Sequence, residues 1–186
     1  MTAGSGLLLG IIASQITGRL STNSYESIAT VNVSSNTSTI SFSSIPSTFK
    51  HLQLRFVSKT SAASGSVVMQ FNGDTGTNYS AHYLLGSGSA ASASAFTSRA
   101  NMFIGSTNAT ANVVTASIVD VLEYANTNIN KTIRCLEGFD SNGGGEIILF
   151  SGNWRNTSAV TSITIFESAG ASFTANSQFA LYGIRG

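Results

Sequence analysis

From Tyr25 to the C-terminus, apolar and polar residues alternate, and this period of two constrains the fold more than any other feature of the sequence. The alternation is clear in Ala29–Val33, Ile40–Ser43 and Leu52–Phe56. Because successive side chains of a strand point to opposite faces, this pattern predicts strands with one buried face. Later runs have the same β-branched or aromatic character: Val113–Tyr124, Thr132–Gly138, Ile147–Phe150, Ser162–Phe166 and Phe179–Ile184.

Clusters of Gly, Asn and Ser separate these runs, and the strongest turn signals are Asn72–Gly76 and Asp140–Gly145. We count about eight to ten strands with no amphipathic helix between them. The sequence therefore predicts an all-β fold, an antiparallel β-sandwich of jelly-roll type, over residues 25–186. The segment Gly86–Thr97, rich in Ser, Ala and Gly, is expected to be a long exposed loop.

Residues 1–24 have a different period. Leu8, Ile12, Ile16 and Leu20 recur at every fourth position and would form one apolar face of a short helix. Such a helix is marginal alone, so it either packs on the sandwich or docks on another protein or on copies of itself. The polar stretch Ser21–Ser24 favours the second interpretation, a helical or extended attachment and oligomerisation segment. Its apolar residues are Leu7, Leu8, Leu9, Ile11, Ile12, Ile16 and Leu20.

Charged residues make up only 9% of this 186-residue chain, against roughly 25% in an ordinary soluble domain. The few lysines form no basic stripe, so we expect no nucleic-acid binding, and no run reaches the ~18 apolar residues needed for membrane insertion. Neither His51 nor His82 lies in a catalytic or metal-binding motif. We therefore predict no catalytic residue, no metal site and no cofactor. Cys135, the only cysteine, is expected to be a small buried core residue.

Two acidic features leave alternatives open. Glu137 and Asp140 could supply the carboxyl pair of a glycosidase, although their place at a strand end and a turn indicates solvated turn residues. The turn Asp140–Glu146 has oxygen ligands at alternate positions, as a calcium loop does. It lacks further acidic ligands, so we prefer tight-turn chemistry as its explanation.

Five residues could contact a receptor or a glycan. Tyr79, His82 and Tyr83 follow a glycine-rich turn, and Trp154 and Arg155 lie between two expected strands. Aromatic faces beside Asn, Asp and Arg can bind sugars by stacking and hydrogen bonding. The alternative is that these rings cap the ends of the sandwich core.

Six strings spread over most of the chain carry a family resemblance: Leu7–Gln15, Tyr25–Val31, Ser44–Leu54, Phe71–Tyr79, Asp120–Ile133 and Phe179–Gly186. Together they resemble small virion proteins of tailed bacteriophages, of the tail-fibre or minor structural type. The resemblance implies a β-sandwich that forms a homotrimer, an N-terminal segment that attaches it to another virion protein, and no catalytic motif.

From this resemblance we expect a non-enzymatic structural protein that is assembled in the host cytoplasm and exposed on the exterior of the virion. The favoured role is a tail-fibre-like or receptor-binding protein that contacts the host surface, with a surface glycan as one candidate partner. A capsid decoration protein that stabilises the head is the alternative, and a polysaccharide depolymerase is a remote one.

Overall fold

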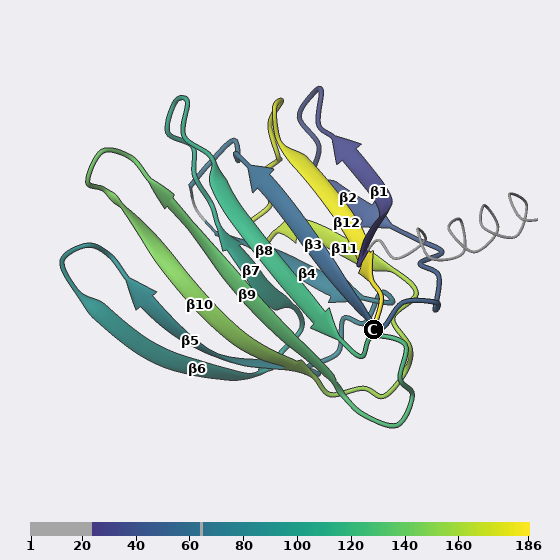
Figure 1. The fold of residues 1–186 in the computed structure, drawn as a ribbon. Coiled ribbons are helices and arrows are strands. Elements are labelled where there is room, and N and C mark those ends of the chain that lie inside the picture. The colour runs from purple at the N-terminus through teal and green to yellow at the C-terminus, as the bar shows by residue number, and fades with distance from the viewer. Residues whose placement is uncertain (1–23, 64) are drawn as a thin grey trace, which may run out of the picture.

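The computed structural model describes residues 24–63 and 65–186. In this part of the chain it contains twelve strands and no helix, arranged as two antiparallel sheets packed face to face (Figure 1). The predicted all-β sandwich is confirmed. The apolar attachment segment predicted at Leu7–Leu20 lies outside the described residues.

The larger sheet has eight strands and lies in front in Figure 1. In spatial order they are β1 (Tyr25–Asn32), β12 (Gln178–Ile184), β3 (His51–Ser58), β8 (Thr115–Leu122), β9 (Lys131–Asp140), β10 (Gly145–Trp154), β5 (Tyr79–Gly86) and β6 (Ala91–Arg99). The smaller sheet has four strands: β2 (Thr39–Phe42), β11 (Ile163–Glu167), β4 (Ser66–Phe71) and β7 (Met102–Ser106).

Four nested antiparallel pairs give the sandwich its jelly-roll topology. The strand β2 pairs with β11, β3 with β8, β4 with β7, and β5 with β6, as if one long hairpin had been rolled into two sheets. The hairpin β9–β10 is inserted between β8 and β5, while β1 and β12 extend the larger sheet beyond β3. The insertion makes the larger sheet broader than the sheet that covers it.

The core lies where the inward residues of the two sheets meet. Burial alternates along β8 and β9 as the period of two predicts. Phe56 and Phe179 stack with ring centroids 5.1 Å apart, and Phe173 meets Phe179 edge-on at 4.9 Å. Cys135 is buried among these apolar side chains, as expected for a small core residue.

One predicted element is wrong. The segment expected to be a long loop contains the strand β6, which pairs with β5 along most of its length, and only residues 87–90 form the connecting turn. Ala and Ser differ little in hydropathy, so their alternation from Ala91 to Ala95 gives almost no periodic signal. Pairing with β5, rather than local propensity, makes this segment a strand.

Candidate interaction surface and acidic cavity

The outer face of the larger sheet, turned away from the smaller sheet, carries a row of exposed apolar side chains. Four neighbouring strands contribute one residue each, and each residue stands directly opposite the next: Ile118 on β8, Leu136 on β9, Leu149 on β10 and Leu84 on β5. Their exposed fractions run from 44% for Ile118 to 60% for Leu84. Because neighbouring strands lie about 4.8 Å apart, the four side chains form a continuous row, which we call the ridge.

A second outward row lies two residues along each strand from the ridge. On β8, β9, β10, β5 and β6 it consists of Ala116, Gly138, Ile147, Gly86 and Ala91, of which only Ile147 is large. On β3 the row ends at Val57, which is 37% exposed. Gly138 cannot carry a side chain without a shift, because a Cβ there would lie 2.6 Å from the Glu146 carbonyl oxygen. A cavity of about 850 Å³ follows this row between the ridge and the glycine-rich hairpin turns. We call this row the groove.

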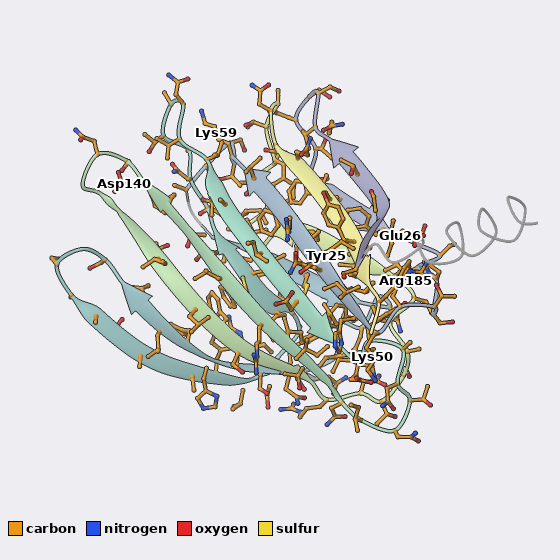
Figure 2. The ribbon with its side chains drawn as sticks, viewed as in Figure 1. Tyr25, Glu26, Lys50, Lys59, Asp140 and Arg185 are labelled. Carbon is orange, nitrogen blue, oxygen red and sulfur yellow. The ribbon has the colours of Figure 1, made fainter. Side chains whose placement is uncertain are left out.

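Polar residues border the ridge on its other side. The next outward row contains Gln53, Asp120, Arg134, Ser151 and His82, again in direct register. The Gln53 Nε2 donates a hydrogen bond of 2.7 Å to Asp120 Oδ1. Figure 2 shows other charged groups at the margins of the molecule, with Asp140 at the β9–β10 tip and Lys50 and Arg185 at the opposite end. We call the ridge and the groove together the apolar band, and this polar row its rim. An apolar band with a polar rim is typical of a protein interaction site.

The band reaches a free edge of the sheet. Among residues 24–63 and 65–186, β6 pairs only with β5, and its side chains from Ala91 to Ser98 carry no charge. Ala91 and Ala93 continue the groove and the ridge onto this strand. Edge strands normally carry charges or bulges that prevent pairing with another chain. In β6 the register shift and the one charge, on Arg99, both lie at its C-terminal end, so Ala91–Phe96 has neither.

A second cavity, of about 510 Å³, lies on the inner face of the same sheet, lined by β5, β6, β7, β9 and β10. Glu137, only 2% exposed, accepts hydrogen bonds from the Ser106 backbone N–H (3.2 Å) and hydroxyl (2.8 Å). The same hydroxyl contacts Glu146 Oε1. A hydroxyl donates only one hydrogen, so Ser106 Oγ can donate to only one of the two carboxyl groups at a time.

The pKa of Glu137 reflects this buried position. Burial raises the pKa of Glu137 to about 7, and the charge of Glu146 adds to the rise against the hydrogen bonds from Ser106. The structure therefore pairs Glu137 with Glu146 and not with Asp140. Asp140 is the exposed last residue of β9, and its Oδ1 accepts a hydrogen bond from the Asn142 N–H at 2.8 Å. The alternation of the strand already indicated that the Glu137 side chain points inward, because Glu137 lies an even number of residues from Ile133 and Cys135.

Two of the predicted glycan contacts, Tyr79 and Trp154, are fully buried. The Trp154 ring packs edge-on against Phe71 at 5.3 Å, and its Nε1 donates a hydrogen bond of 2.6 Å to Asp74 Oδ2. A glycan could not stack on either ring without opening this end of the sandwich. The structure supports the alternative, that both rings cap the core.

The other three predicted contacts do not converge. His82 is exposed on the outer face, whereas Tyr83 points to the inner face, where it is half-buried against Phe150 at 5.6 Å. Adjacent strand residues point to opposite faces, so these two cannot form one subsite. Arg155 lies beyond the end of β10 and donates to the Thr77 carbonyl oxygen.

The turn weighed as a calcium loop is a tight hairpin turn with positive φ angles at Asn142, Gly143 and Gly145. Across residues 24–63 and 65–186, no three His, Cys, Asp or Glu side chains are grouped so that they could hold a metal ion. The same residues include no helix that is long and apolar enough to cross a membrane. The chain matches no protein-family model, and a search of curated proteins likewise gives no match.

Proposed function

We propose that this chain is a non-enzymatic structural component on the exterior of a tailed-bacteriophage particle, built into its assembly through the ridge and the groove. The observation that carries the assembly role is the apolar band with its polar rim on the outer face of the larger sheet. The phage assignment is supported by the resemblance of the six sequence strings.

Burial of the apolar band against a partner is favourable in free energy. Each ridge side chain is about half exposed, and burying the remaining half would contribute about 1 kcal/mol per side chain. The chain has a net charge of only +1, so copies or partners meet little electrostatic repulsion. A protein that worked alone would leave this apolar surface in water at a cost to its solubility.

In the favoured role the protein is tail-fibre-like or receptor-binding. Residues 1–24 would attach it to a neighbouring virion protein, and the sandwich would contact the host surface. Several weak contacts would then multiply through effective concentration, because the copies are held together.

Capsid decoration is the second candidate, and one observation favours it. Tyr79 and Trp154, the rings best suited to stack on a host glycan, are buried. A decoration protein needs a surface that fits its neighbours and needs no receptor site.

Labelling intact particles with antibodies against the full chain distinguishes these roles. Label at the tail supports the fibre role, and label over the head lattice supports decoration. Particles that carry no label at either place would contradict the virion assignment.

The non-enzymatic part has a separate test, because Glu137 and Glu146 form a carboxyl pair beside a cavity. We expect purified protein to release no new reducing ends from host surface glycans. Release that disappears in both Glu137→Gln and Glu146→Gln would show glycosidase chemistry instead.

A further inference from the structure

We infer that the ridge and groove are covered by the same surface of a second copy of this chain, with the ridge of each copy seated in the groove of the other. This inference rests on the proposed assembly role of the surface and names its partner. Such a contact is isologous, since both copies use one patch related by a two-fold axis.

The shapes of the two rows are self-complementary. We place the two-fold axis perpendicular to the strands, midway between the ridge and the groove. Each ridge residue of one copy then lies over the groove residue of the same strand in the other copy, two positions away in the sequence. Large side chains then meet small ones: Ile118 over Ala116, Leu136 over Gly138, and Leu84 over Gly86. On β10 two large apolar side chains, Leu149 and Ile147, meet, and at the border on β3 Arg55 lies over Val57.

The same axis brings opposite charges together at the rim. On β9 it places Arg134 of one copy over Asp140 of the other, since both residues point outward and lie equally far from the axis. These two residues are six positions apart on one strand, roughly 20 Å, and cannot meet within one copy. The pairing therefore adds charge complementarity to the apolar contact.

The size of the surface suits a stable pair. The band and its polar rim extend roughly 25 Å across the strands and roughly 20 Å along them. These dimensions give a flat area of about 500 Å², more than half of the ~800 Å² that each partner buries in a stable complex. The uncharged stretch Ala91–Ser98 of β6 lies at the border of the same surface, where a second copy would shield the edge of the sheet.

Filling the groove tests the inference, because it separates shape from mere apolarity. We expect sedimentation equilibrium of the full chain to show two-copy association, and Ala116→Leu to raise the dissociation constant at least tenfold by blocking the ridge. Thr132→Leu, which adds the same side chain on the outer face beyond the rim, should leave it unchanged. Association that is unchanged or tighter in Ala116→Leu, or a wild-type chain that stays monomeric, overturns the inference.

Charge reversal tests the register. Arg134→Glu and Asp140→Arg should each weaken association, and the double variant should recover most of the loss because the pair is restored between copies. No recovery in the double variant would overturn the two-fold register. An assembly of three copies, as the family resemblance implies, would also contradict it. Particle labelling is independent of these measurements, so failure here leaves the virion role to its own test.

Discussion

At the scale of single residues, one buried carboxyl group links the stability of the fold to pH. The pKa of Glu137 is raised from 4.5 to about 7, so between these values the unfolded chain releases a proton that the folded chain keeps. The stabilising effect is complete below pH 4.5 and is lost as the pH rises through 7. The free energy of unfolding therefore differs by about 3 kcal/mol between pH values below 4.5 and above 7.

We predict that Glu137→Gln removes most of this pH dependence, since the amide keeps the shape but cannot ionise. Urea unfolding at pH 5 and pH 8 measures it, with a large loss of free energy of unfolding in the wild type and a much smaller one in the variant. Glu123→Gln is the matched control, because Glu123 pairs with Lys50 at the surface and its pKa is lowered. Equal pH dependence in wild type and Glu137→Gln would contradict the raised pKa of Glu137.

At the scale of elements, the β9–β10 hairpin depends on one glycine more than on its neighbour. Gly143 and Gly145 both have positive φ, but a Cβ on Gly143 would meet nothing within 4 Å, whereas one on Gly145 would lie 2.2 Å from the Phe139 carbonyl oxygen. We predict that Gly143→Ala costs about 1 kcal/mol of unfolding free energy and Gly145→Ala about 3 kcal/mol or more. Thermal unfolding of the two variants measures this, and equal losses would be the contrary result.

The elements also show how far the sequence predicts the structure. Runs with strong alternation, such as Leu52–Phe56, were recognisable as strands because a single buried face imposes the period. Strand β6 could not be recognised because its hydrogen-bonded pairing with β5, and not an alternation of apolar and polar residues, makes it a strand. The ridge could not be predicted, since each of four strands contributes one residue and their order in space is not written locally. One clue existed: Ile147–Phe150 is apolar at every position, which indicates a strand with two apolar faces.

At the scale of the whole molecule, the low content of charged residues and the exposed apolar band both favour association between copies. A chain with 9% charged residues has little to keep copies apart, and its larger sheet offers a surface that fits itself. Folding and association should then be linked, because a second copy binds only the folded sandwich.

Linkage makes the melting temperature depend on concentration. A ligand that binds only the native state stabilises it by mass action, and here the ligand is the protein itself. We predict that the melting temperature of the wild type rises by about 2 °C for each tenfold increase in protein concentration. In Ala116→Leu it should stay constant, because the filled groove leaves a folded but unpaired sandwich. Scanning calorimetry over a hundredfold range of concentration measures both. A slope that is the same in the two proteins would place the contact between copies elsewhere on the chain.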